Sequence, residues 1–362
     1  MKKVAFFASI FAVLMLFVAC GADSEKKPVP EKKVSVEKEK KASVVATIYP
    51  QYAWLKKILG GHADSIGLTL LIKNGMDMHS YKPSAADIAK IARADMVVYV
   101  GGESDEWIEK ALAATPKEGR IEVNLLKSMG SRVKEEEIVE GMQREEHHHE
   151  HAEEEEHEHH EHAEVHEHEH HEHAEEHEHH QEEVENDEHI WLSLKNAEML
   201  VKLLAESLAK MDSENATSYR SNAAAYIDQI NALDEEYRVL KAGSTHKTIL
   251  FGDRFPFRYL VDDYGIKYYA AFVGCSAESE ASFETVAFLA NKMDSLALPV
   301  IFTIDGSDGK IARAVLAASK KSKDAEVVSL NSMQSVKDSQ IDSLDYLGIM
   351  RENLEVLKKA LK

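Results

Sequence analysis

The chain has 362 residues and a formal net charge of -21, but eighteen of its 64 acidic residues are glutamates between positions 145 and 183. Outside that stretch the charges nearly balance, with 46 acidic and 43 basic residues. No basic surplus remains for phosphate contacts, so we expect no binding to nucleic acid, and the length is sufficient for two domains.

The N-terminus predicts export and a lipid anchor. Two lysines, an apolar run over residues 4–19 and then Cys20 follow the order of a signal peptide that ends in a bacterial lipobox, with Phe17 where leucine is usual. We expect residues 1–20 to be the signal peptide and Cys20 to be lipidated. A plain secretory signal with an incidental cysteine is the alternative. Residues 21–43, rich in Lys, Glu, Val and Pro, are expected to tether the folded part to the membrane.

Strands and helices alternate along the first half of the chain. Apolar β-branched runs predict strands at residues 43–48, 66–72, 96–100 and 120–123. Helical spacing predicts helices at residues 51–59, 84–92 and 106–113. This alternation is typical of a parallel sheet with helices on both faces. Residues 44–211 are therefore expected to form an N-terminal α/β lobe.

A histidine-rich segment interrupts this lobe. Sixteen of the twenty histidines lie between positions 147 and 180, interleaved almost entirely with glutamate. Such a composition cannot bury apolar surface, which predicts disorder. Neutral imidazole binds zinc, copper and nickel, and carboxylates add charge attraction. We expect residues 145–183 to collect divalent transition metals, the alternative being a purely solvating acidic tract.

The second half repeats the α/β pattern after two helices at residues 191–211 and 213–241. The second of these carries an apolar stripe and spans about 40 Å, which suits a connector over residues 212–243, although an ordinary surface helix would show the same stripe. Residues 244–362 are expected to form a C-terminal α/β lobe, with a cleft where the strand ends of the two lobes face each other. Its predicted strands are 247–251, 267–272, 300–304 and 326–330, and its predicted helices are 257–263, 283–296, 310–320 and 346–361.

Four histidines lie outside the histidine-rich segment. His79 follows a predicted strand end and His189 begins the helix after the segment, so both are expected on loops that open on the cleft. His246 precedes a strand and His62 follows a Gly-Gly helix stop, so we expect both to be solvated residues without a function.

Short motifs recur along the chain from Val44 onward: Tyr49-Pro50, Gly75 to Ser84 with Asp87-Ile88, Ala94-Asp95, Gly101 with Glu106-Trp107, Glu188-His189-Ile190-Trp191, Tyr264-Gly265 and residues 346–361. These motifs resemble the landmarks of the solute-binding proteins of zinc and manganese ABC importers. The resemblance covers the chain from Val44 to the C-terminus, and the acidic histidine-rich loop is typical of the zinc-carrying members. It implies two lobes joined by one long helix, with His79 and His189 as metal ligands.

The second lobe departs from the family pattern. Arg254 stands where the family usually presents a third histidine or a glutamate, and Asn331 lies near the place of an acidic ligand. We expect Asp253 and Cys275 to complete the metal site, with Arg254 paired to a carboxylate such as Asp305. Asp253 as a helix cap or arginine partner is the alternative, and a packed core thiol is the alternative for Cys275. With Cys20 lipidated, Cys275 has no partner for an intramolecular disulfide.

The resemblance implies a monomeric, extracytoplasmic receptor, not an enzyme, that carries Zn²⁺ to an ABC permease in the membrane. Histidine and thiolate ligands favour zinc over manganese, which prefers oxygen, so a manganese receptor is the alternative within the family. A metallo-enzyme would need an open coordination position and a general base. A metal-storage lipoprotein or adhesin would bind many ions without one tight site.

Overall fold

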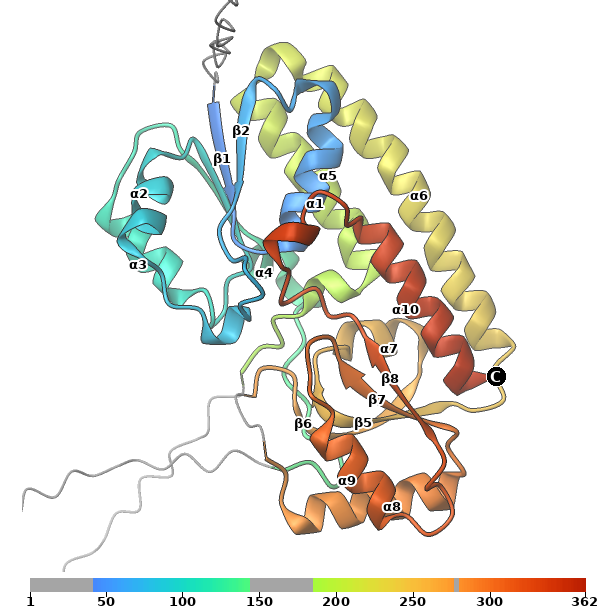
Figure 1. Cartoon of the computed structure of the whole chain (residues 1–362). Helices are drawn as coiled ribbons and strands as arrows, with labels where there is room; N and C mark the ends of the chain where they lie inside the picture. Colours follow the sequence, from blue (N-terminus) through green and yellow to red (C-terminus); the bar gives the residue numbers. More distant parts are fainter. Residues whose placement is uncertain (1–41, 144–184, 277–279) are drawn as a thin grey trace, which may run out of the picture. The chain divides into compact units, whose positions relative to one another are not determined.

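The computed structural model describes residues 42–143, 185–276 and 280–362 (Figure 1). The predicted signal peptide, Cys20 and nearly all of the predicted tether lie outside these residues, as does the whole histidine-rich segment over residues 145–183. The first strand begins at Ala42, so the last two residues assigned to the tether belong to the fold. Among the described residues, no helix combines the length and apolar character that crossing a membrane requires.

The first lobe contains a parallel four-stranded sheet in the order β2-β1-β3-β4. The two central strands of this sheet are short, apolar and largely buried, as expected for a parallel sheet covered on both faces. The strands are β1 (Ala42–Ala46), β2 (Ile66–Leu70), β3 (Met96–Tyr99) and β4 (Ile121–Asn124), and the helices are α1 (Tyr49–Leu59), α2 (Ala85–Arg93), α3 (Glu106–Ala114) and the short α4 (Leu125–Met129).

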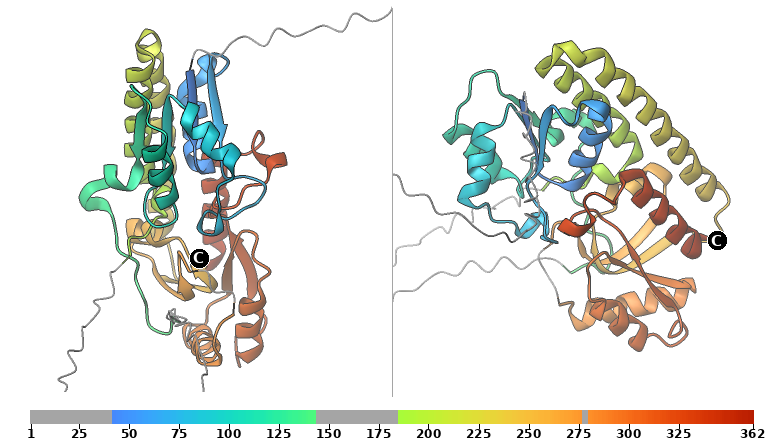
Figure 2. Two further views of the ribbon diagram at one scale, coloured as in Figure 1. Left: turned by 90° about the vertical axis from the view of Figure 1, so that its left-hand side faces the viewer. Right: turned by 45° about the horizontal axis from the view of Figure 1, so that its top comes forward.

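The second lobe repeats the first, with a parallel sheet in the order β6-β5-β7-β8. Helices flank each sheet (Figures 1 and 2), and this confirms the predicted class of two α/β lobes. The strands are β5 (Thr248–Phe255), β6 (Lys267–Val273), β7 (Val300–Ile304) and β8 (Glu326–Leu330), and the helices are α7 (Arg258–Tyr264), α8 (Phe283–Leu296), α9 (Lys310–Ala318) and α10 (Tyr346–Leu361).

Strand β5 is longer than its sequence predicts. The prediction ends at residue 251, before Gly252 and two charged residues, whereas the strand continues to Phe255 with a register shift between Phe251 and Arg254. The shift is a local irregularity in the pairing with β6. It matters for the site because it brings Arg254 to the carboxyl end of the second sheet.

Two long helices, α5 (Leu194–Met211) and α6 (Ala216–Ala242), pack against each other and connect the lobes. The predicted stripe of α6, from Tyr219 to Leu240, is buried. It packs on α1 of the first lobe and on α7 and α10 of the second. The helix is thus a connector rather than an ordinary surface helix.

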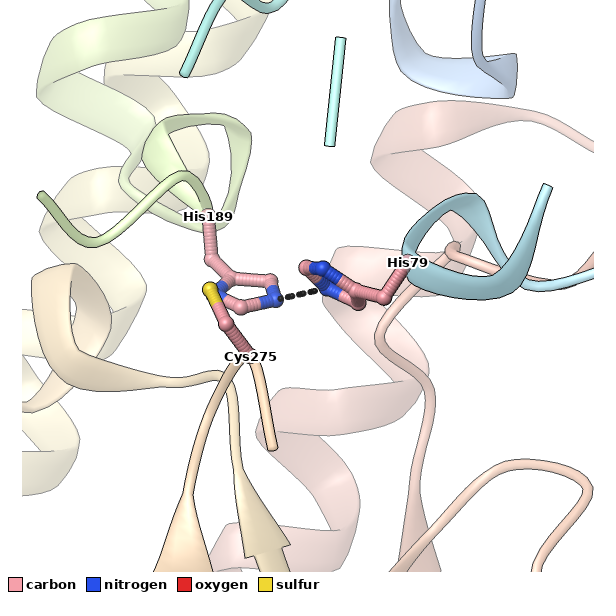
Figure 3. Close-up of side chains that lie close together, drawn as sticks. All are labelled: His79, His189 and Cys275. Atoms are coloured by element: carbon pink, nitrogen blue, oxygen red, sulfur yellow. Dashed lines mark hydrogen bonds between the residues drawn. The ribbon is translucent and has the colours of Figure 1, made fainter. Parts of the chain in front are cut away.

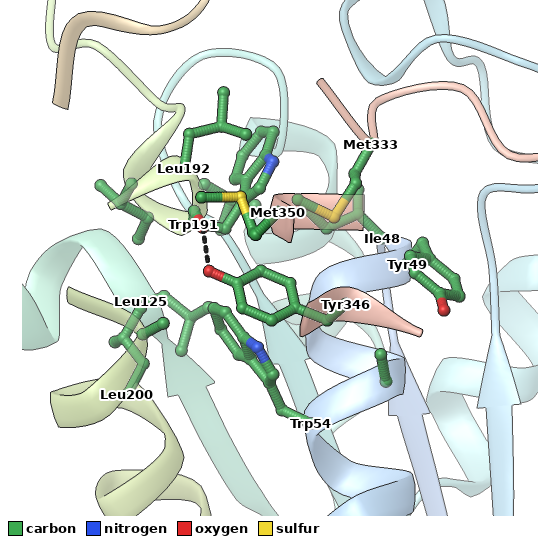
Figure 4. Close-up of a cluster of buried hydrophobic side chains, with 14 of the residues drawn as sticks. Ile48, Tyr49, Trp54, Leu125, Trp191, Leu192, Leu200, Met333, Tyr346 and Met350 are labelled. Atoms are coloured by element: carbon green, nitrogen blue, oxygen red, sulfur yellow. Dashed lines mark hydrogen bonds between the residues drawn. The ribbon is translucent and has the colours of Figure 1, made fainter. Parts of the chain in front are cut away.

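The two lobes also share a buried hydrophobic core (Figure 4). Trp54 of α1 packs edge-on against Tyr346 of α10, with ring centroids 5.2 Å apart. The Tyr346 hydroxyl donates to the Trp191 carbonyl at 2.7 Å, and the Trp191 indole N–H donates to the Ser332 carbonyl at 2.8 Å. Apolar packing and buried hydrogen bonds therefore tie the loop after His189 to both lobes.

The segment from residue 133 to residue 143 precedes the histidine-rich segment and lies against the second lobe. The Lys134 N–H donates to the Tyr259 hydroxyl, and the Gln143 N–H donates to the Ala271 carbonyl. The returning chain pairs with it through Asp187 N–H to the Lys134 carbonyl. Sequence alone assigned this segment to the first lobe, because nothing local in it indicates its distant partners.

Candidate metal centre

His79 lies in a single 3-10 turn, Met78–Ser80, that follows β2. The Asp77 side chain caps this turn by accepting the His79 backbone N–H at 3.0 Å. On the ring, Nδ1 lies 2.7 Å from the Ser104 hydroxyl and 3.8 Å from a Glu188 carboxylate oxygen. The other ring nitrogen, Nε2, faces His189 and Gln334.

His189 is fully buried and precedes the 3-10 turn Ile190–Leu192. One carboxylate oxygen of Asp187 makes two contacts with His189. It accepts the backbone N–H at 2.8 Å and lies 2.9 Å from the ring Nδ1. A carboxylate on one imidazole nitrogen fixes the ring and its tautomer and raises the basicity of the other nitrogen. His189 therefore has the surroundings of a metal-binding histidine.

The two imidazoles and Cys275 converge (Figure 3). The Nε2 atoms of His79 and His189 lie 3.1 Å apart. Each of the three residues offers a ligand atom, and these atoms all lie within 4.8 Å of one another. Cys275 follows β6 in the second lobe, and its backbone N–H donates to Glu136 at 2.9 Å. The first lobe thus supplies two nitrogen donors and the second lobe one sulfur donor.

Gln334 completes the surroundings, and sequence reasoning missed it. Its amide nitrogen lies 2.7 Å from Nε2 of His79 and 2.8 Å from Nε2 of His189, while its Oε1 is buried without a hydrogen-bond partner. The sequence did contain one sign of its role. Gln334 lies in the loop after β8, at the carboxyl edge of the second sheet, where Cys275 also lies after β6. Exchanging the amide atoms by rotation would direct the oxygen, a possible ligand, at the same point.

Burial sets the ionisation of the site. The pKa of His79 is lowered well below its usual range, chiefly by burial and then by the neighbouring His189 and Arg254. Burial, followed by nearby carboxylates, raises the pKa of the Cys275 thiol well above its usual range. Burial also raises the pKa of Glu188 to about 7. Without a cation, burial therefore favours the neutral imidazole of His79 and the protonated thiol of Cys275.

The other residues of the second lobe lie elsewhere than the sequence predicts. The Asp253 carboxylate is outside the group of three, accepting the N–H groups of Arg254, at 2.9 Å, and Ile304, at 3.3 Å. Arg254 pairs with Asp77 rather than with Asp305, whose oxygen instead accepts the Ser332 N–H and hydroxyl. Asn331 is also turned away from the site, because its backbone and side chain bond Asn353 and the loop.

The two remaining described histidines lie away from this site. The His62 ring packs edge-on against Tyr219, with centroids 5.7 Å apart, and the His246 backbone bonds the Leu361 carbonyl at the amino end of β5. Both side chains are partly buried rather than fully solvated. A cleft of about 600 Å³, lined by Asp77, His79 and Arg254 among others, opens beside the site.

Comparison with known proteins places these features in a family. The family model described as "Zinc-uptake complex component A periplasmic" matches residues 44–360. The "High-affinity zinc uptake system protein ZnuA" of Bacillus subtilis is 30% identical over 353 residues, covering 97% of this chain and 96% of that protein. The "Zinc-binding lipoprotein AdcA" of Streptococcus pneumoniae (strain TIGR4) is 29% identical over 99% of this chain and 61% of its own length.

Some relatives are much longer than this chain. The "Zinc-binding protein AdcA" of Streptococcus pyogenes (strain MGAS315) is 28% identical, and the chain spans only 56% of its length. Among solved structures, the metal-dependent lipoprotein YcdH of Bacillus subtilis has a TM-score of 0.65 at 25% identity, covering 89% of this chain and 99% of that one.

The Zn(II)-bound ZnuA-like domain of Streptococcus pneumoniae AdcA has a TM-score of 0.62 at 24% identity over 88% of this chain and 98% of its own, which shows the shared fold. The match of the family model covers both lobes and the long connecting helix. The chain therefore belongs to the ZnuA family, the periplasmic component A of zinc-uptake complexes.

Proposed function

We propose that this chain is an extracytoplasmic receptor that captures Zn²⁺ between its two lobes and delivers it to an ABC permease. The observation that carries the proposal is the convergence of two imidazoles and one thiol to within 4.8 Å from opposite lobes. The names of the relatives, which include a zinc uptake protein and zinc-binding lipoproteins, support the same cargo.

The ligand set we propose is His79 and His189 through Nε2, Cys275 through its thiolate, and Gln334 through its amide oxygen. Nitrogen and sulfur donors suit Zn²⁺, whereas Mn²⁺ prefers oxygen donors. One thiolate supplies a single negative charge to the dication, and the buried carboxylates of Asp187 and Glu188 lie directly behind the imidazoles. Asp253 is omitted, because its carboxylate is bound to backbone N–H groups.

A zinc titration with a competing chromophoric chelator tests the site. The double variant His79→Ala/His189→Ala should lose tight binding of one zinc ion, while the matched variant His62→Ala/His246→Ala should retain it. The chelator must be strong enough to strip the histidine-rich segment, which we propose as a separate and weaker collector. Wild-type affinity in the first variant would refute the assignment.

Calorimetry with Zn²⁺ and Mn²⁺ separates the two family functions. We expect zinc to bind at least a hundredfold more tightly, and a preference for manganese would show that oxygen donors, not Cys275, dominate the site. A storage protein or adhesin would instead bind several ions with similar affinity and show no tight step.

The anchor is a proposal from the sequence, because Cys20 lies outside the described residues. We propose that it is lipidated and holds the receptor at the outer face of the membrane, beside the permease. Labelling with a fatty-acid probe should mark the wild-type chain and not Cys20→Ala. Labelling that survives this substitution would assign the modification to another residue.

A further inference from the structure

Arg254 joins the two segments that carry the candidate ligands. It lies at the end of β5, past the register shift, and its side chain is only 17% exposed. Its guanidinium forms an ion pair with Asp77 of the first lobe and donates to the Ser276 carbonyl of the second at 3.3 Å. Both partners are neighbours of candidate ligands.

In the first lobe, Arg254 is linked to His79 through the Asp77 carboxylate. The Asp77 oxygen that does not pair with Arg254 accepts the His79 backbone N–H at 3.0 Å and so caps the turn that carries the imidazole. A shift of the Asp77 side chain would therefore move the start of this turn. Arg254 holds that side chain in place from the opposite lobe.

In the second lobe, Arg254 is linked to Cys275 through the backbone of Ser276. Ser276 directly follows Cys275, and its carbonyl accepts from the guanidinium. The Cys275 N–H on the preceding side is bound by Glu136. The backbone that carries the thiol is thus fixed from both sides, by Glu136 and by Arg254.

The chemistry of these two contacts requires arginine. A guanidinium has five N–H donors in a planar fork, so it can pair with a carboxylate and bond a carbonyl at the same time. A lysine has one ammonium group on a flexible stem and cannot span both partners in this geometry. The Asp77 carboxylate also offsets the positive charge that Arg254 brings close to a cation site.

We infer that Arg254 is a positioning residue that fixes the His79 imidazole and the Cys275 thiol at the separation that one metal ion requires. The inference rests on the proposed function, since it assigns a role within the same site. It gives Arg254 a role other than ligation, namely to set the geometry of the ligands across the two lobes.

The experiment uses the full chain with Co²⁺ and Zn²⁺ as probes. Bound Co²⁺ reports thiolate ligation through a charge-transfer band, independently of transport. We expect Arg254→Met to weaken zinc binding about tenfold to a hundredfold, the usual range for residues behind metal ligands, and to reduce that band. Unchanged affinity and an unchanged band would overturn the inference.

Asp77→Asn is the sharper variant. Its amide oxygen can still cap the His79 turn, but its charge is gone, so only the pairing with Arg254 is removed. We expect a loss similar to that of Arg254→Met, and no further loss in the double variant, because both substitutions break one linkage. Additive losses would show that the two residues act separately and would also overturn the inference.

Two further variants complete the design. Arg254→Lys should restore part of the affinity through the ion pair alone, and Arg351→Met, which removes an exposed arginine paired with Glu236, should leave binding unchanged. If circular dichroism shows that Arg254→Met does not fold, Arg254→Lys and Asp77→Asn decide the question. A wild-type chain without tight zinc binding or a thiolate band would refute the proposed function itself, whereas a normal wild type with unaffected variants would refute only this inference.

Discussion

The Nε2 atoms of His79 and His189 lie 3.1 Å apart although 110 positions separate them in the chain. Two imidazole lone pairs facing each other at this distance repel unless a hydrogen-bond donor or a cation lies between them. The Gln334 amide nitrogen lies within 2.8 Å of both atoms and can donate one N–H to each. The same residue therefore satisfies the imidazoles without a cation and, with its oxygen turned inward, can bind one.

Gln334 should control zinc affinity. Gln334→Ala removes a neutral oxygen donor, and we expect zinc binding about tenfold weaker. Gln334→Glu places a carboxylate at the same point, and we expect tighter binding at pH 8, because an anionic ligand adds charge compensation. Chelator competition measures both. Equal affinity in all three chains would exclude Gln334 from the coordination shell.

Zinc binding at pH 8 should release about one proton. Burial keeps the Cys275 thiol protonated at this pH, and only the thiolate binds a metal, so its proton must leave. Burial lowers the pKa of His79, so this imidazole is already neutral at pH 8 and releases no proton. Calorimetry in two buffers of different ionisation enthalpy measures the release. Cys275→Ser should abolish it, and a proton released equally by that variant would refute thiolate ligation.

Glu188→Gln should stabilise the metal-free chain at alkaline pH. The folded pKa of Glu188, about 7, exceeds its value of 4.5 when unfolded, so its contribution to stability is present below pH 4.5 and is lost as pH rises through 7. Removing the charge should therefore raise the free energy of unfolding more at pH 8 than at pH 5, by at most about 3 kcal/mol. Urea denaturation at both pH values measures this.

Exposed Glu352→Gln is the control for this comparison and should show no such difference. The same Glu188→Gln variant should bind zinc more weakly, because a negative charge near the His79 ring is gone. A variant that is less stable at pH 8 than at pH 5, relative to wild type, would contradict the assigned direction.

Tyr346→Phe should lower stability by about 1 to 3 kcal/mol. The buried hydroxyl donates to the Trp191 carbonyl at 2.7 Å, and its removal leaves that carbonyl without this partner. Tyr52→Phe on α1, a half-buried position, is the matched control. Urea denaturation should show the loss in the first variant only. A loss below 0.5 kcal/mol would mean that the hydrogen bond is not what ties α10 to this loop.

Local patterns in the sequence were enough to predict most elements of the two sheets. The helix at 283–296 and the strands at 300–304 and 326–330 agree with the structure to the residue, because short apolar runs and helical periodicity reflect burial within each element. The repeat of strand, helix and strand in both halves likewise predicted the two α/β lobes. His79, His189 and Cys275 could be singled out from their places next to predicted elements. His79 and Cys275 each follow the carboxyl end of a strand, and His189 stands at the start of a helical segment.

The contacts between distant segments were decided only by the tertiary structure. Arg254 meets Asp77 rather than Asp305 because the irregular end of β5 directs it toward the first lobe. Gln334 lies against both imidazoles because the loop after β8 reaches into the cleft, and residues 133–143 lie on the second lobe through hydrogen bonds to remote residues. Sequence periodicity reports which face of an element is buried. It carries no information on which side chains from separate strand ends share one point in space, and a metal site depends on that convergence.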